Sequence, residues 1–281
     1  METKLTGIAN EVVIADNRPT VLIGERINPT GKKKLAEALR AGDLGFVQQE
    51  ALDQVRAGAD MIDVNVATFG VDEVTMLPQV VKAVMETVDV PLCIDSSNHE
   101  ALAAAIKIYP GKPLINSVTG EESSLKTVLP LIKEHGAAVI SLVQDEDGVP
   151  TSSNKRLAIA RKIIKRAEEI GIPRQDIIID CLALAVGADP KSGITTMETI
   201  RQIKNELGVN LTLGASNVSF GLPDRNLLTN TFAAVAIAAG ITCLIVDVAK
   251  VHPTVLAVDL VLGRDSYARR YITGYRKRHT V

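Results

Sequence analysis

The chain alternates short apolar runs with longer segments of helical periodicity, and the alternation repeats eight times. The runs are rich in Val, Ile and Leu and nearly continuous, which indicates strands buried on both faces. Strands separated by helices pair in parallel, and eight such units close a (β/α)₈ TIM barrel. The predicted strands are Val21–Gly24, Met61–Val66, Leu92–Ile94, Pro113–Ile115, Ala138–Val143, Ile177–Leu182, Leu211–Leu213 and Cys243–Val248.

Neither a linker nor a low-complexity tract divides the chain, so residues 1–281 are expected to form a single domain. Residues 1–19 precede the regular pattern and are expected to be an extension or a cap on the barrel, with a short strand at Val12–Ile14. The same alternation also permits an open doubly wound sheet. The absence of a GxGxxG motif after the first strand makes that alternative weaker.

Composition excludes several classes of protein. The net charge is −2, aromatic residues make up 3% and Trp is absent, which argues against nucleic-acid and anionic-membrane partners. The apolar stretches are too short to span a bilayer, and no signal peptide is expected. Cys93, Cys181 and Cys243 are far apart inside apolar runs, which predicts buried thiols in a reducing compartment. We therefore expect a cytoplasmic protein.

Polar side chains follow the predicted strands at the end where TIM barrels carry their functional groups. All are carboxylates or amides. Such a ring suits a neutral heterocycle rich in N–H groups, because a carboxylate accepts paired N–H donors and an amide both donates and accepts. Some of these residues, Asp63 among them, could instead cap the following helices, as Asn98 and Asp224 are expected to do. The strand-end residues are Glu25, Asn28, Asp63, Asn65, Asp95, Asn116, Gln144, Asp180, Asn217 and Asp247.

The segment LTLGASNVSFG, residues 211–221, combines an apolar strand with small residues and one amide, Asn217. Small residues next to an amide favour a flat ligand lying against the backbone. A simple turn is the alternative, since Gly, Ser and Asn are common turn residues. The sequence contains neither a His/Cys cluster of metal-binding spacing nor a nucleophile motif, so no protein-bound metal is expected.

Six motifs, in order, give the chain a family resemblance. They are GERIN (24–28), GADMIDVN (58–65), CIDSSN (93–98), LINS (114–117), IIID (177–180) and SNVSFGLPDR (216–225). Together they resemble the pterin-binding methyltransferases. The similarity is closest to the methyltetrahydrofolate:corrinoid protein methyltransferases and to the folate domain of cobalamin-dependent methionine synthase.

The resemblance implies a role for each matching residue. Asp95 would hold the pyrimidine edge of the pterin, with Asn116 and Asp180 completing the contact. Asn217 would be the catalytic residue that reaches the reactive N5 of the folate. Six more residues are implied in folate binding: Glu25, Asp63 and Asn65 lining the mouth, Arg225 near the pterin or glutamyl tail, and Ser219 and Gly221 allowing the backbone to approach the ring.

The resemblance also implies the substrates and partners. Tetrahydrofolate and 5-methyltetrahydrofolate would be substrates, and the methyl group would move between N5 and the cobalt of a corrinoid. The chain lacks an Asp-x-His-x-x-Gly cobalamin motif, so the cobalamin is expected on a separate corrinoid protein or free in solution. Transfer from methylcobalamin to tetrahydrofolate in a demethylation pathway is favoured. A homodimer is expected, although no strip of residues identifies the interface.

Two alternatives remain. Dihydropteroate synthase shares the pterin pocket, and Lys250–His252 is similar to its basic-x-His anion site, but that family has Lys where this chain has Asn217. A non-catalytic folate-binding subunit is the second alternative. The Lys32–Lys34 run favours a solvated helix start over a contact with a polyglutamate tail or an acidic partner.

Overall fold

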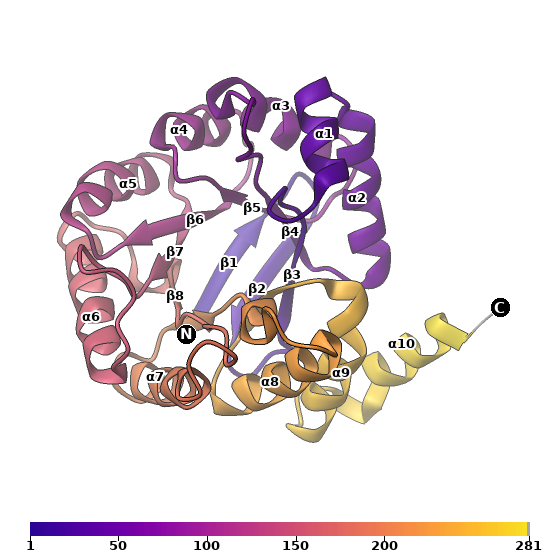
Figure 1. The fold of residues 1–281 in the computed structure, drawn as a ribbon, viewed down its shortest axis with the longest axis vertical. Coiled ribbons are helices and arrows are strands. Elements are labelled where there is room, and N and C mark those ends of the chain that lie inside the picture. The colour runs from indigo at the N-terminus through magenta and orange to yellow at the C-terminus, as the bar shows by residue number, and fades with distance from the viewer. Residues whose placement is uncertain (280–281) are drawn as a thin grey trace.

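Eight parallel strands form the centre of the molecule in a computed structural model that describes residues 1–279. The strand order is β10-β3-β4-β5-β6-β7-β8-β9. A parallel bridge between Gly214 and Ile245 joins the two ends, and Ile245 N donates to Leu213 O at 3.1 Å. The strands therefore close into a barrel inside a ring of helices (Figure 1). This arrangement confirms the predicted (β/α)₈ fold.

Every predicted strand is present, with ends displaced by a few residues. The displacement is greatest at the carboxyl ends, where pairing stops and the functional loops begin. The barrel strands are β3 (Val21–Ile27), β4 (Met61–Val64), β5 (Leu92–Asp95), β6 (Leu114–Thr119), β7 (Ala138–Leu142), β8 (Ile177–Asp180), β9 (Asn210–Thr212) and β10 (Cys243–Val246).

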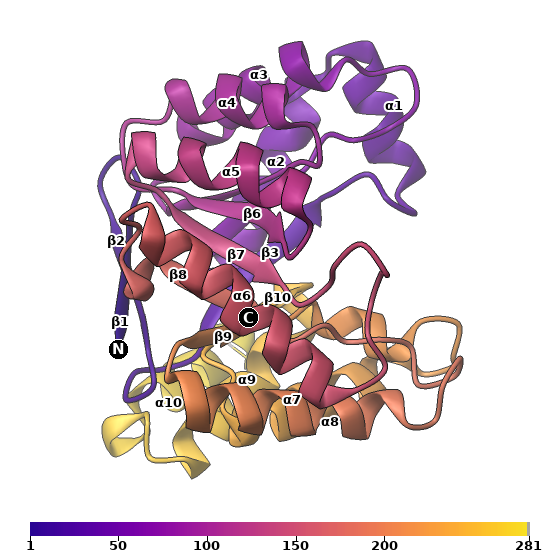
Figure 2. The same ribbon diagram turned by 90° about the vertical axis from the view of Figure 1, so that its left-hand side faces the viewer.

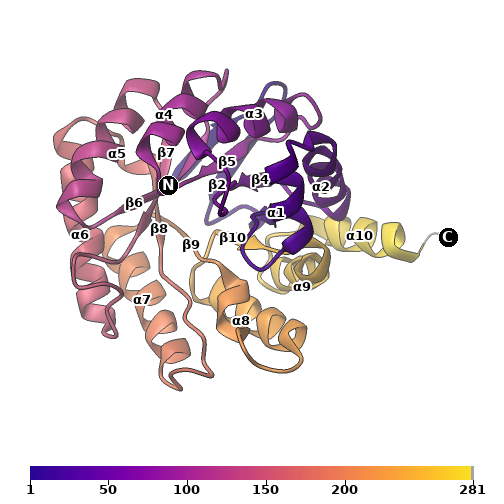
Figure 3. The same ribbon diagram turned by 45° about the horizontal axis from the view of Figure 1, so that its top comes forward.

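Helices follow the strands around the outside of the barrel (Figures 1 and 3). Two helices, α1 and α10, stand outside the eight-fold pattern. Helix α1 is separated from α2 by Gly42, which has a left-handed conformation, and by the cap Asp43, while α10 projects from the barrel. The helices are α1 (Lys33–Ala41), α2 (Leu44–Ala57), α3 (Glu73–Met85), α4 (His99–Lys107), α5 (Glu122–His135), α6 (Ser153–Glu169), α7 (Ser192–Leu207), α8 (Arg225–Ala239), α9 (Val248–Val261) and α10 (Arg269–His279). Three short 3₁₀ helices are η1 (Arg174–Asp176), η2 (Ala215–Ser219) and η3 (Ser266–Ala268).

An antiparallel hairpin closes the amino-terminal end of the barrel. It consists of β1 (Glu2–Thr6), which the sequence pattern did not reveal, and β2 (Glu11–Ala15), which contains the strand predicted at Val12–Ile14. Leu5 and Ile14 are fully buried within the apolar interior of the barrel. Figure 2 shows the hairpin on one side of the barrel and the loops that follow the strands on the other. In the described part of the chain the hairpin covers the first end, so a ligand would enter at the second.

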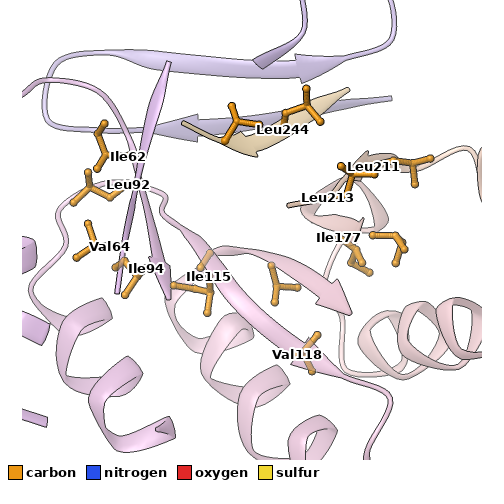
Figure 4. Packing of buried hydrophobic residues seen from close by; sticks show 14 of the residues in the cluster. Ile62, Val64, Leu92, Ile94, Ile115, Val118, Ile177, Leu211, Leu213 and Leu244 are labelled. Carbon is orange, nitrogen blue, oxygen red and sulfur yellow. The ribbon is translucent and has the colours of Figure 1, made fainter. Parts of the chain in front are cut away.

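The strands separate two apolar layers because successive side chains point to opposite faces. One set fills the barrel interior and includes Ile23, Cys93 and Ile178. The other set faces the helices, and Figure 4 shows part of it, including Ile94 and Ile115. This second layer carries most of the hydrophobic core.

Several local predictions are confirmed. Asn98 caps α4 by accepting from Glu100 N and Ala101 N, and Asp224 caps α8 by accepting from Leu227 N. The three cysteines are buried and unpaired. Along residues 1–279, every helix is too short or too polar to cross a bilayer.

Candidate functional site

The alternation that fills the barrel interior also determines which polar side chains face its open end. On β5, Asp95 comes two residues after the interior Cys93, and on β8, Asp180 comes two residues after the interior Ile178. Residues two apart on a strand share a face, so both carboxylates extend the interior column toward the open end. The same relation holds for Glu25, Asp63, Asn116 and Asp247, and Asn65 follows Asp63 by two residues just beyond the end of β4.

Two carboxylates and two amides form a cluster where β4, β5 and β6 end. Asp95 lies opposite Asn116 in the sheet register. Asn65 Nδ2 donates to Asp95 Oδ2 at 2.9 Å, and Asn116 Nδ2 donates to Asp63 Oδ1 at 3.4 Å. The structure thus brings together four of the residues predicted to line the site.

The two acids of this cluster are shifted toward their neutral forms. Burial raises the pKa of Asp63 well above its ordinary value, and the nearby Asp95 adds to the effect. Burial also raises the pKa of Asp95 to about 6, with Glu73 contributing in the same direction. Asp63 is 2% exposed and caps no helix, because α3 is capped by Asp72. Buried acids with raised pKa values in a barrel mouth are typical of functional sites.

Asp180 is a buried acid on the opposite side of the barrel mouth. It is 7% exposed, and Leu182 N donates to its Oδ1 at 2.7 Å. Burial raises its pKa to about 7, against the opposing effects of the Leu182 hydrogen bond and the charge of Arg156. A ligand that donates N–H groups to this carboxyl would favour its ionised form, because hydrogen bonds to a carboxylate lower its pKa.

A second polar group lies where β3, β9 and β10 end. Ser216 Oγ donates to Glu25 Oε1 at 2.5 Å, which ties the loop after β9 to β3. Burial raises the pKa of Glu25, while the Ser216 hydrogen bond and Lys32 act against the rise. Asp247 pairs with Lys250 Nζ at 2.9 Å. Glu25 therefore belongs to the same open end as the acids of β4 and β5.

Asn217 lies in η2, at the exposed rim of the barrel. Its side-chain amide forms no hydrogen bond with the described residues, while its backbone N–H donates to Gly214 O at 3.3 Å. A β-carbon at position 214 would approach Asn217 Nδ2 to 3.2 Å, so the small residue leaves the amide room to turn. The amide is held near the mouth and remains available to a ligand.

Arg225 and Ser219 brace the loop that carries Asn217. Arg225 donates through Nη2 to Ser216 O at 2.9 Å and through Nε to Ser219 Oγ at 3.2 Å. Ser219 is fully buried and its hydroxyl contacts Thr229 Oγ1 at 2.9 Å. Gly221 is exposed with φ of +77°, a conformation that favours glycine. The folate contacts implied for these three residues stay predictions.

Two cavities open on the mouth. One, of about 310 Å³, reaches from Asp95 past Ser117 to Gln144. The other, of about 120 Å³, is lined by Ser216, Arg225, Asp247 and Lys250 among others. Within residues 1–279, no group of three His, Cys, Asp or Glu side chains is placed to hold a metal ion.

The prediction that Lys32–Lys34 is a solvated helix start is wrong for Lys32, which belongs to the site. Lys33 and Lys34 are exposed at the start of α1, as predicted, but Lys32 is half-buried and its Nζ donates to Glu25 O and Asn28 O, both at 3.0 Å. Burial lowers its pKa. The charge pattern alone could not separate Lys32 from its neighbours, because the fold of the GERIN loop creates the carbonyl pair.

Lys250 and His252 do not converge on one anion site. Lys250 pairs with Asp247 at the mouth. His252 packs instead against Gly58, and its ring hydrogen-bonds the backbone of Ala57 near the end of α2. The arrangement expected of a dihydropteroate synthase is therefore not formed by this pair.

A family model described as pterin binding enzyme matches residues 24–247 of the chain. The chain belongs to the pterin-binding enzyme family. The matched region contains every site residue predicted from the sequence. Membership of this family was predicted from the six motifs and is confirmed.

The relatives include a methylcorrinoid:tetrahydrofolate methyltransferase and methionine synthases. The chain is 29% identical to the methylcorrinoid:tetrahydrofolate methyltransferase of Eubacterium limosum, over 92% of this chain and 96% of that protein. It is 32% identical to the methionine synthase of Mycobacterium tuberculosis, over 94% of this chain but 24% of that protein. The predicted relationship to tetrahydrofolate- and corrinoid-dependent methyltransferases is thereby confirmed.

Solved structures of pterin-binding enzymes share the fold. The dihydropteroate synthase of Yersinia pestis, bound to a pterine-sulfa conjugate, aligns with a TM-score of 0.73 and 18% identity over 94% of this chain and all of that chain. That of Xanthomonas albilineans, bound to 7,8-dihydropteroate, aligns with a TM-score of 0.65 and 21% identity over 89% of this chain and 95% of that chain. At such identities the similarity concerns the fold alone.

Proposed function

We propose that this pterin-binding enzyme transfers a methyl group between the cobalt of a corrinoid and N5 of tetrahydrofolate, with methylcorrinoid as the physiological donor. The observation that carries the proposal is the ring of buried acids and amides at the barrel mouth with the uncommitted amide of Asn217 on its rim. The similarity to a methylcorrinoid:tetrahydrofolate methyltransferase over 96% of its length supports the reaction and its direction.

The acids of the mouth would bind the pterin by its ring N–H groups. A carboxylate accepts two parallel donors from one ring edge, a geometry that neutral hydroxyls cannot provide. Burial gives Asp95 and Asp180 raised pKa values of about 6 and 7. N–H donors from a ligand would favour the ionised forms, because they hydrogen-bond the carboxylates. Asn116 beside Asp95 can bridge a ring carbonyl and a ring N–H.

Asn217 would act at the reacting nitrogen. When tetrahydrofolate is the acceptor, the N5 lone pair attacks the methyl carbon, the carbon–cobalt bond breaks with its electron pair remaining on cobalt, and the N5 proton leaves. The Asn217 carbonyl oxygen can accept a hydrogen bond from that N5–H. In the reverse direction the amide N–H donates to N5 as the nitrogen gains negative charge, an interaction that strengthens in the transition state.

The methylcorrinoid would arrive on a separate protein that docks over the mouth. Phe69, in the loop after β4, is 95% exposed, and Phe220, in the loop after β9, is 69% exposed. Exposed aromatic side chains on the rim offer apolar contact area to a partner. Replacing both with Ser should raise KM for a methylated corrinoid protein and leave the tetrahydrofolate Kd unchanged.

A spectroscopic assay tests the reaction directly. Methylcobalamin is mixed with tetrahydrofolate and the enzyme, and loss of the methylcobalamin absorbance is followed; the reverse mixture contains cob(I)alamin and 5-methyltetrahydrofolate. Enzyme-dependent change in both directions is expected. Tight tetrahydrofolate binding without turnover would identify a binding subunit instead. Condensation of a pterin pyrophosphate with para-aminobenzoate would identify a synthase, and either result overturns the proposal.

We further propose that two copies of the chain associate through α8 and its neighbours. Apolar grooves of about 530 and 490 Å³ flank α8, the first shared with α7 and the second with α9. Val261 is 85% exposed on this face, and Leu227 and Val235 are also exposed. An apolar face of this extent is typical of a subunit interface, and a two-fold axis lets the same patch serve both copies. Figure 3 shows α8 and α9 side by side.

Light scattering tests the assembly. The wild-type chain should have a mass of about 60 kDa, twice the 30.0 kDa of one chain. Val235→Lys combined with Val261→Lys should give a monomer. Ile170→Lys, which changes an exposed residue just after α6, is the matched control and should stay dimeric. A wild-type mass of about 30 kDa would refute this association.

A further inference from the structure

Arg156 of α6 is a fully buried guanidinium behind the candidate site, and the proposed reaction assigns it no part. It is 0% exposed and forms no ion pair with the described residues. Its Nε donates to Pro150 O at 2.8 Å, and its Nη1 donates to Cys181 O at 2.9 Å and to Leu182 O at 3.0 Å. A charge buried against three carbonyl oxygens requires a reason, because burial of an unpaired charge is strongly unfavourable.

The three carbonyls belong to two loops at the barrel mouth. Pro150 lies in the loop between β7 and α6, while Cys181 and Leu182 follow β8 directly. The planar fork of an arginine can bridge such groups, and a lysine can reach fewer of them in the same geometry. Arg156 therefore fixes the loop after β7 to the loop after β8, the strand that carries Asp180.

The residue Leu182 has a backbone conformation that requires support. Its φ is +55°, in the left-handed region that leucine disfavours. In this orientation its N–H donates to Asp180 Oδ1 at 2.7 Å, while its carbonyl accepts from Arg156 and from Thr196 Oγ1 at 3.0 Å. The hydrogen bonds to Cys181 O and Leu182 O hold the peptide groups on both sides of Leu182. The Leu182 N–H, which shares its peptide group with Cys181 O, in turn holds the Asp180 carboxylate.

We propose that Arg156 is a positioning residue for pterin recognition: by holding the peptide groups on both sides of Leu182, it keeps that residue in its left-handed conformation and fixes the carboxylate of Asp180 toward the ligand. Because this role concerns pterin binding, it rests on the proposed function. The charged and titratable groups near Asp180 are Arg156, Cys181 and Cys243. Arg156 is the cation among them, so its charge also favours the ionised form that accepts N–H donors.

Conservative substitution separates this role from a purely structural one. Arg156→Lys keeps the charge and loses the fork, so the tetrahydrofolate Kd should rise about 10- to 100-fold, the range known for the outer partners of metal ligands. The turnover number at saturating tetrahydrofolate should change less than about threefold, because Asn217 is untouched. Arg264→Lys is the matched control: Arg264 is also largely buried, but it pairs with Asp259 at the closed end.

A double-mutant cycle with Asp180→Asn tests whether Arg156 acts through Asp180. In that background Arg156→Lys should weaken binding less than about twofold further, since the carboxylate it positions is absent. Arg156→Gln, which removes the charge, should also move the acid limb of the affinity–pH profile to higher pH than Arg156→Lys does. Should the Gln variant not fold, the Lys variant and the cycle still decide.

The outcomes are distinguishable. Failure of the wild-type protein to bind tetrahydrofolate would refute the proposed function before any variant is made. If the wild-type protein binds but Arg156→Lys and Arg264→Lys lower only the melting temperature, the positioning role is overturned. It is equally overturned if Arg156→Lys weakens binding as much in the Asp180→Asn background as in the wild type.

Discussion

Two buried aspartates at opposite ends of the barrel differ in how many hydrogen-bond donors and cations the fold places around them. Asp259, at the closed end, accepts from Thr20 N at 2.9 Å and Thr20 Oγ1 at 2.8 Å, and Arg264 and Arg270 lie against it at 3.6 and 3.2 Å. Asp180, at the open end, accepts one hydrogen bond from the described residues, that of Leu182 N. The fold supplies Asp259 with two hydrogen bonds and two cations, whereas it supplies Asp180 with a single hydrogen bond.

The closed end of the barrel therefore contributes to stability, whereas the open end carries the groups available for function. At the closed end Asp259 has hydrogen bonds from Thr20 and two arginines beside it, and Leu5 and Ile14 of the hairpin fill the interior. At the open end burial outweighs the hydrogen bonds from Asn116, Asn65 and Leu182 and raises the pKa of Asp63, Asp95 and Asp180. Such groups favour a ligand that brings its own N–H donors.

Removal of the closed-end carboxylate should have the largest effect on stability. Asp259→Ala leaves Arg264 and Arg270 without their anion, so the free energy of unfolding should fall by about 3–5 kcal/mol in urea titrations. The tetrahydrofolate Kd of the folded protein should not change. A loss below about 1 kcal/mol would mean that the two ends are not energetically distinct.

Removal of the open-end carboxylate, that of Asp180, should raise the free energy of unfolding at neutral pH. The folded state raises the pKa of Asp180 from its ordinary 3.8 to about 7, so between these values it binds more protons than the unfolded chain. Stability from this residue therefore falls as pH rises from about 4 to about 7. Asp180→Asn should stabilise the protein by up to about 4 kcal/mol at pH 8, since a pKa difference of one corresponds to about 1.36 kcal/mol.

Urea titrations of both proteins at pH 4 and pH 8 measure this effect. The difference between Asp180→Asn and wild type should be small at pH 4, where both are uncharged at this position, and should grow toward pH 8. A variant less stable than wild type at pH 8 would contradict the assignment of Asp180 as an under-satisfied acid.

Asn217 should affect rate and not stability, because its amide is exposed and uncommitted. Asn217→Ala should lower the single-turnover methyl-transfer rate about 100-fold or more and change the tetrahydrofolate Kd less than about threefold. Asn154→Ala, at the start of α6, is the control and should alter neither quantity. A loss confined to affinity would refute the catalytic role.

Lys32 should give the smallest effect. Lys32→Met removes two hydrogen bonds to the GERIN loop and should lower the free energy of unfolding by about 1 kcal/mol. Lys33→Met, at the neighbouring exposed position, should remain within about 0.5 kcal/mol of wild type. Equal effects of the two substitutions in urea titrations would show that Lys32 is as solvated as its neighbour.

Local patterns predicted the barrel because each strand has a strong signal of its own. Continuous apolar runs such as that around Ile177 and helix stops such as Gly58 depend on a few neighbouring residues. The hairpin strand β1 escaped notice because Glu2–Thr6 contains a single apolar residue, Leu5, among charged residues and threonines. The apolar outer face of α8 was not recognised in the sequence, because its Leu, Val and Ala residues are of the same types as those that the helix buries against the barrel.

The sequence by itself determined the eight-fold barrel and the polar residues at its strand ends, including Asp95, Asp180 and Asn217. Periodicity and position along a strand are local properties, so they survive without any knowledge of contacts. Tertiary structure alone decided how many donors each of these groups has, that Lys32 folds back onto carbonyls, and that Arg156 lies behind Asp180. Those relations join residues distant in the chain, and hydrogen bonding and burial exist only once the barrel has closed.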